Sequence, residues 1–145
     1  MSERDQRFLV FHGAILLMAG NLAGLPFAQA IADGWGEEAV RGWRVAHTGL
    51  VSAGLLLVAV GTALRHVVLG ASAGRMLRWA LLVAGYASLG LVVGAAAAVR
   101  GLQPMGPPVN LVVLASNAAL GLGAFIGTAL LIRGAWAGYS AVRRA

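Results

Sequence analysis

The chain has 145 residues, of which 59% are apolar and only 11% are charged. Its mean hydropathy of +0.81 is typical of a membrane protein and excludes an ordinary soluble domain. Because cysteine is absent, disulfides, thiolate-ligated haem, iron–sulfur clusters and cysteine-based zinc sites are excluded as well.

All 11 basic residues are arginine, since the chain contains no lysine, and together with 5 acidic residues they give a net charge of +6. A basic chain can bind nucleic acid, but such proteins gather their cations on one face. Here the arginines stand at the ends of apolar blocks, where they set the orientation of membrane helices. We therefore expect a lipid bilayer as the partner of this chain, and no nucleic acid.

Four apolar blocks of about 20 residues predict four transmembrane helices, because a helix needs that length to cross the hydrocarbon and must satisfy its own backbone there. The sequence therefore predicts an all-α fold, an integral membrane four-helix bundle in a single domain that covers residues 1–145. The predicted helices span residues 8–31, 43–64, 79–99 and 109–132.

The first predicted helix carries His12, Asn21 and Pro26. Proline lacks a backbone donor, so Pro26 is expected to kink this helix or to leave a carbonyl free. The acidic segment 33–38 follows as a connection.

The second predicted helix opens with Trp43 and Arg44, a pair typical of the headgroup region, and places His47 about one turn inside the apolar run. An ionisable ring at that depth is costly unless something binds it. Imidazole is also the commonest protein ligand for metals, including haem iron. His47 is therefore the leading metal-ligand candidate, although an imidazole that only contacts headgroups is the alternative.

The third predicted helix follows a small-residue turn at residues 70–74 and contains Tyr86 and Ser88. A connection with three prolines at residues 101–108 cannot be the interior of a helix. The fourth predicted helix contains Asn117 and ends at Arg133. Residues after it, including Trp136, Tyr139, Arg143 and Arg144, predict a short interfacial tail.

The arginines also predict how the bundle is oriented. One side of the predicted topology holds both termini and the second connection, with eight arginines, and the other side holds three: Arg41, Arg44 and Arg100. By the positive-inside rule both termini are cytoplasmic, in the inner (cytoplasmic) membrane of a bacterial-type cell. His12 then lies toward the inner face and His47 toward the outer face, too far apart to share one iron.

No acidic residue lies inside a predicted helix, so paired-carboxylate and carboxylate-metal chemistry have no residues to use. An enzyme built from this chain needs a bound cofactor for its reactive group. Uncharged polar residues could then assist; these catalytic candidates are Asn21, Ser52, Tyr86, Ser88 and Asn117. Each could instead bond across helices, as polar residues in membranes commonly do.

The segment from Gly42 to Gly49 reads Gly-Trp-Arg-Val-Ala-His-Thr-Gly, and the chain also has a His12-Gly13 pair and a Gly85-Tyr86-Ala87-Ser88-Leu89-Gly90 segment. With this order of features, the chain resembles the styrene oxide isomerases, small membrane proteins of four helices. The resemblance covers most of the chain, and Gly-Trp-x-x-Ala-His-x-Gly is its specific part.

The resemblance implies a homotrimer that binds haem b through the signature histidine, here His47. It also implies that ferric iron acts as a Lewis acid on a small apolar epoxide, which opens at its benzylic carbon and becomes an aldehyde after a hydride shift. Arg44, one turn before His47, is expected to bind a haem propionate or to anchor in the headgroups.

Three positions depart from the family pattern. The family has an Asn six residues after the ligand, where this chain has Ala53, and an Asn and a Tyr at positions that correspond to Ser88 and Val92. The resemblance therefore favours haem binding over isomerase activity. A non-catalytic membrane haem protein (a sensor, a carrier or an electron-transfer subunit) and a bundle without a cofactor remain the alternatives.

Overall fold

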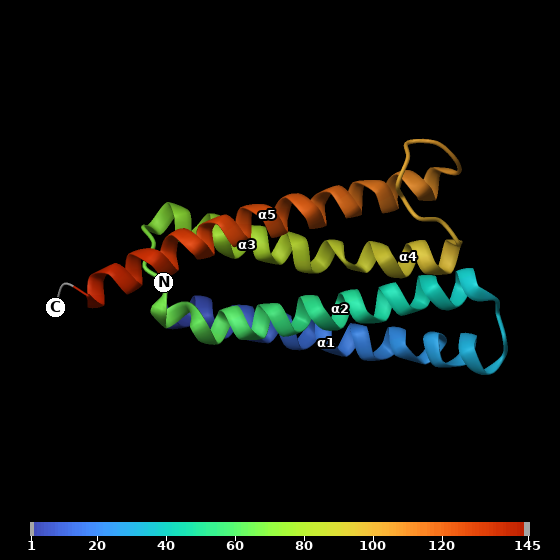
Figure 1. Ribbon diagram of the computed structural model, residues 1–145, viewed down its shortest axis with the longest axis horizontal. Coiled ribbons are helices and arrows are strands. Elements are labelled where there is room, and N and C mark those ends of the chain that lie inside the picture. Colours follow the sequence, from blue (N-terminus) through green and yellow to red (C-terminus); the bar gives the residue numbers. More distant parts are fainter. Residues whose placement is uncertain (1, 144–145) are drawn as a thin grey trace.

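Four long apolar helical segments run back and forth along one axis in the computed structural model, which describes residues 2–143 (Figure 1). Their elements, in chain order, are α1 (Glu3–Ala32), α2 (Glu37–Ala63), the 3₁₀ turn η1 (Leu64–His66), α3 (Ala71–Ala87), α4 (Leu89–Ala97) and α5 (Pro108–Val142). Together α3 and α4 make one span, so four segments are long and apolar enough to cross a membrane. The described residues contain no strand, and the predicted all-α fold with four transmembrane helices is confirmed.

The helices are longer than the apolar blocks that predicted them. Helix α1 begins at Glu3 instead of residue 8, because Ser2 and Asp5 form a capping box: the Asp5 amide donates to Ser2 Oγ at 3.2 Å, and the Ser2 amide donates to Asp5 Oδ2 at 3.1 Å. Helix α2 begins at Glu37 because acidic residues in a first turn complement the helix dipole.

The last two spans also extend past their predicted limits. The predicted turn at residues 70–74 is mostly the first turn of α3, with Gly70 as its N-cap. The predicted interfacial tail continues α5 as regular helix as far as Val142, so Trp136 and Tyr139 lie on that helix. Arg144 lies outside the described residues. Pro26 lies within α1, which continues past it.

The predicted third helix is divided at Ser88. The Ser88 hydroxyl donates to the carbonyl of Gly85 at 2.5 Å, and the Ser88 amide donates to the same carbonyl at 3.2 Å. These two bonds tighten the helical turn at Ser88. Serine hydroxyls within helices commonly bond back to a carbonyl of the preceding turn in this way. Helix α4 resumes at Leu89 and ends at Ala97, and its C-cap residue Ala98 has left-handed backbone angles.

The bundle has two layers, one made of the α1–α2 hairpin and one made of α3, α4 and α5 (Figure 1). Both termini and the connection from η1 to α3 lie at one end, and the other two connections lie at the opposite end. Between the layers lies a core of buried leucines that includes Leu16, Leu50, Leu57 and Leu77.

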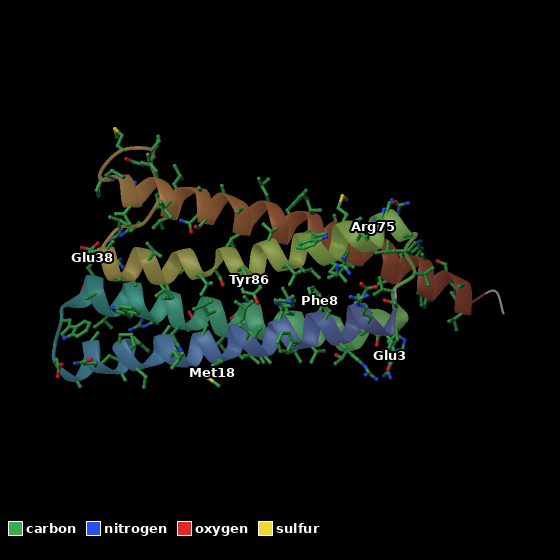
Figure 2. All side chains as sticks on the ribbon, turned by 180° about the vertical axis from the view of Figure 1, so that it is seen from behind. Glu3, Phe8, Met18, Glu38, Arg75 and Tyr86 are labelled. Atoms are coloured by element: carbon green, nitrogen blue, oxygen red, sulfur yellow. The ribbon has the colours of Figure 1, made fainter. Side chains whose placement is uncertain are left out.

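Large apolar side chains also cover the outside of the bundle. Met18, Leu25, Leu56 and Phe125 are each at least half exposed, and Met18 points away from the helices in Figure 2. In water such a surface would aggregate, whereas in a bilayer it faces lipid. The chain is therefore a multi-pass membrane protein.

Candidate functional site: the His47 seam

His47 belongs to the seam along which α2 packs against α1. A seven-residue spacing places His47, Gly54 and Gly61 on the same face of α2. Gly54 meets the backbone of α1 so closely that a Cβ on it would lie 2.7 Å from the Leu17 amide nitrogen, and a Cβ on Gly61 would lie 3.0 Å from the Gln6 carbonyl oxygen. These glycines allow the two helices to approach closely.

At the first position of this repeat, the imidazole of His47 packs into a notch in α1, the space left by the missing side chain of Gly24. A Cβ added to Gly24 would lie 3.1 Å from Nδ1 and 3.2 Å from Cε1 of the ring, so a larger residue there would displace it. The ring of Phe27 covers His47 with its centroid 6.1 Å away and its plane tilted by 19°. The imidazole is thus fixed by three residues of α1: Gly20, Gly24 and Phe27.

The hydrogen bond of His47 determines which ring nitrogen carries the proton. Nδ1 lies 2.8 Å from the carbonyl oxygen of Gly20. A carbonyl can only accept, so Nδ1–H donates and the neutral ring has its lone pair on Nε2. Nε2 has no hydrogen-bond partner among the described residues and is not fully buried by them. Metal-binding histidines are commonly held in this way, with one nitrogen on a carbonyl and the other free to ligate.

Arg44 lies near the same aromatic ring. Its guanidinium carbon is 5.8 Å from the centroid of Phe27, the ring that also stacks on His47. Its side chain makes no ion pair within the described residues and is exposed. A cation held beside the candidate ligand can bind an anionic group on a cofactor.

The other small residues of the signature face a different helix. Gly42, Ala46 and Gly49 are spaced along one face of α2, where a Cβ on Gly42 would lie 3.4 Å from Ala95 Cα and one on Gly49 would lie 2.6 Å from Leu91 Cδ1. Both contacts are with α4. The signature therefore packs α2 against α4 with its small residues and turns His47 toward α1.

Asn21, Ser52 and Asn117 are not joined to one another or to His47 by any described hydrogen bond. Asn21 and Ser52 are exposed and have no described side-chain partner. Asn117 donates to the carbonyls of Arg100 and Gly101 at 3.1 and 3.2 Å, and so it fixes the connection before α5.

Tyr86 and Ser88 lie on α3 and at its end. The Tyr86 hydroxyl is 2.6 Å from Nδ1 of His12 on α1, and Figure 2 shows Tyr86 between the two layers. Ser88 is only 1% exposed, and its hydroxyl is already committed to Gly85. Ala53 and Val92 pack against the hydrophobic core. The three positions that depart from the family pattern, Ala53, Ser88 and Val92, therefore offer no free polar group.

One side-chain pair and one further polar residue have structural partners that sequence reasoning did not identify. The first is the His12–Tyr86 pair, which joins α1 to α3. The second is Asn110, 8% exposed, whose side chain accepts from the Gly101 amide at 2.8 Å and donates to the carbonyls of Gln103 and Met105. An asparagine just after a proline-rich connection was the available signal, since asparagine commonly satisfies backbone groups in turns.

The three described histidines have different hydrogen-bond partners. His47 bonds to α1, His12 bonds to Tyr86, and the exposed His66 accepts from Arg65 Nε at 2.9 Å. No three residues among the described His, Asp and Glu come together as a metal site.

Comparison with known proteins adds one finding. A family model described as styrene oxide isomerase matches residues 5–136, which is most of the chain. Comparisons with curated proteins and with solved structures gave no significant match.

Proposed function

The chain belongs to the styrene oxide isomerase family, and from this premise we propose that it binds haem b through His47 and isomerises small apolar epoxides to aldehydes. The single observation that carries the haem proposal is the hydrogen bond from Nδ1 of His47 to Gly20, at 2.8 Å, which leaves the lone pair on Nε2, an atom with no partner among the described residues.

The residues around His47 fit a haem group. Nε2 of His47 would be the protein ligand, and the exposed Arg44 guanidinium would bind a propionate. Ferric haem, when bound, supplies a Lewis acid that polarises an epoxide oxygen with no net redox change. The chain's own contribution is to hold the imidazole rigidly: Gly24 leaves room for the ring, Phe27 stacks on it, and the carbonyl of Gly20 accepts a hydrogen bond from Nδ1–H.

A homo-oligomer, which we propose to be a trimer, completes this site. Nε2 is not fully buried by its own chain, so a cofactor bound there could also contact a neighbouring copy. A second copy of the chain would cover that cofactor and keep water away from the reacting epoxide. The exposed Asn21 and Ser52 then lie where a neighbouring copy can meet them.

A non-catalytic haem protein is the second candidate function. It is favoured by Ala53 and Val92, which pack against the core where the family has polar groups, and by Ser88, whose hydroxyl is already bonded. An isomerase would therefore have no free polar side chain at these three positions with which to orient the epoxide.

The test is an assay of aryl epoxides by gas chromatography, with haem content measured on the same purified samples. Wild type should form the aldehyde, and His47→Ala should lose both haem and activity. His66→Ala is the matched control, because His66 is exposed and bonds only to Arg65, and it should keep both. Haem without turnover in wild type would favour the non-catalytic function. Stoichiometric haem in His47→Ala would contradict the ligand assignment.

A further inference from the structure

A pocket of about 410 Å³ opens between α1 and α3 at the end of the bundle that holds both termini. Figure 2 labels Glu3 and Arg75 at this end and Glu38 at the opposite end, near which His47 lies. The pocket is therefore far from the His47 seam. Six residues line it: Ser2, Arg4, Asp5 and Phe8 from the start of α1, and Arg78 and Trp79 from α3.

The guanidinium of Arg78 is held in place with one edge free. Nη1 donates to Asp5 Oδ1 at 2.7 Å, and the guanidinium carbon lies 5.6 Å from the ring centroid of Phe8 and 5.7 Å from that of Trp79. Nε and Nη2 have no hydrogen-bond partner among the described residues, and Nε is also buried. These two nitrogens form one edge of the planar group, which matches two oxygens of a phosphate. Because a buried donor without an acceptor is costly, this edge favours a ligand that brings acceptor oxygens.

The charges in the pocket favour an anion. Both carboxylate oxygens of Asp5 are occupied, since Oδ1 accepts from Arg78 and Oδ2 accepts from the amide and the hydroxyl of Ser2. Arg4 is exposed and forms no ion pair within the described residues. The residues that line the pocket thus carry two positive charges and one negative charge, and the negative one is already paired.

The surroundings of the pocket indicate that the anion belongs to a lipid. Trp79 is 57% exposed on the outside of the bundle, and tryptophan rings are enriched at the level of lipid headgroups. Phe11 and Ile15 follow Phe8 along one face of α1, and both are exposed where acyl chains would contact them. A lipid with its phosphate in the pocket can lay an acyl chain along these side chains, whereas a soluble phosphate cannot use them.

We propose that this pocket binds the phosphate of an anionic phospholipid whose headgroup carries no ammonium. The phosphate accepts from Nη2 of Arg78 and from Arg4, and an acyl chain runs along α1. Because Asp5 is already paired, an ammonium headgroup gains no partner there. Basic pockets between transmembrane helices bind anionic headgroups in this way. The site shares no residue with the His47 seam, so its occupancy does not depend on a cofactor.

The test is native mass spectrometry of the purified full chain with phosphatidylglycerol or phosphatidylcholine added at equal concentrations. Wild type and His47→Ala should both bind phosphatidylglycerol more tightly. Arg4→Gln should weaken this binding about fivefold, the factor that one arginine near an anionic lipid contributes. Arg75→Gln is the matched control, because it removes the same charge from an exposed position of α3 outside the pocket, and it should leave the binding unchanged.

Arg78→Lys tests the free edge of the guanidinium. Lysine keeps the positive charge and can still pair with Asp5, but it has no planar fork for two phosphate oxygens. Phosphatidylglycerol binding should therefore fall while the helical circular dichroism signal stays the same. Unchanged lipid binding in this variant would contradict the role of the edge.

Three further results would overturn the proposal. Equal binding of the two lipids would show that the pocket does not recognise charge. Equal losses in Arg4→Gln and Arg75→Gln would assign the binding to the overall charge of this end of the bundle. Displacement of phosphatidylglycerol by an equal concentration of inorganic phosphate would identify a free anion as the ligand. Loss of aldehyde formation with intact lipid binding would contradict the proposed isomerase function and leave this proposal standing.

Discussion

At the scale of single residues, His47 is held mainly by the backbone and small residues of α1. Its ring is fixed by a carbonyl, by the absence of a side chain at Gly24 and by one aromatic ring. The orientation of the candidate ligand is therefore as sensitive to a methyl group on α1 as to changes on its own helix.

Gly24→Ala tests this dependence. The added Cβ would lie 3.1 Å from Nδ1, so the ring must shift and its hydrogen bond to Gly20 must weaken. Supporting contacts of metal ligands are commonly worth 10–100-fold in affinity, so we expect haem to leave roughly tenfold faster. The measurement is haem transfer to excess apomyoglobin, followed in the Soret region.

Gly121→Ala is the control for that variant. A Cβ at Gly121 would meet no atom within 4 Å, and the helix propensity of alanine should leave haem transfer unchanged or slower through added stability. Equal transfer rates for Gly24→Ala and wild type would show that the notch does not position the ring.

His47 could be identified from the sequence as the candidate ligand, but its contacts could not be predicted. An imidazole one turn inside an apolar run, after Trp43 and Arg44, was enough to mark the residue. The partner Gly20 could not be found in this way, because a backbone carbonyl leaves no trace in the identity of the residue. Similarly, nothing in the composition distinguishes Ser88, which bonds within its own helix, from a serine that faces a substrate.

At the scale of elements, small residues decide which helices touch. The α1–α2 seam depends on glycines that bring backbones into contact, and the Gly42, Ala46 and Gly49 face brings α2 against α4. The apolar blocks predicted four spans, but they could not predict where each helix ends. Caps such as Ser2 and acidic first turns such as Glu37 lie outside the apolar blocks and extend the helices beyond them.

The backbone of Ala98, at the end of α4, is strained, and the cost of this strain can be measured as a change in stability. Ala98 has left-handed backbone angles, which cost an L-residue about 1 kcal/mol or more relative to glycine. Ala98→Gly should therefore raise the stability of the purified protein by about 1 kcal/mol. Thermal unfolding in detergent, followed by circular dichroism, measures the shift.

Ala97→Gly, one residue earlier, should change the stability in the opposite direction. Ala97 is the last helical residue of α4, so glycine there should lower stability by roughly 0.5–1 kcal/mol through lost helix propensity. Equal shifts for the two variants would contradict the conformation assigned to Ala98.

At the scale of the whole molecule, both termini and the connection between η1 and α3 lie at one end of the bundle (Figure 1). Most arginines are found at this end, including Arg4, Arg7 and Arg75, so the positive-inside rule predicts that this end is cytoplasmic. With that orientation, we expect the His47 seam to lie in the outer half of the membrane.

Because the chain has no cysteine, single introduced thiols can test this orientation. Ser72→Cys and Gln103→Cys place thiols at exposed positions at opposite ends of the bundle. A membrane-impermeant maleimide should label Gln103→Cys in intact cells and Ser72→Cys only after permeabilisation. The reverse pattern would place the termini outside.

The central claim is that Nε2 of His47 is the one protein ligand of a haem iron. Its most direct test is the absorption and electron paramagnetic resonance spectrum of wild type purified after expression with haem available. We expect a Soret band and a ferric signal typical of one axial histidine, and loss of both in His47→Ala but not in His12→Ala. A colourless wild-type protein, or a spectrum typical of two axial histidines, would contradict the account.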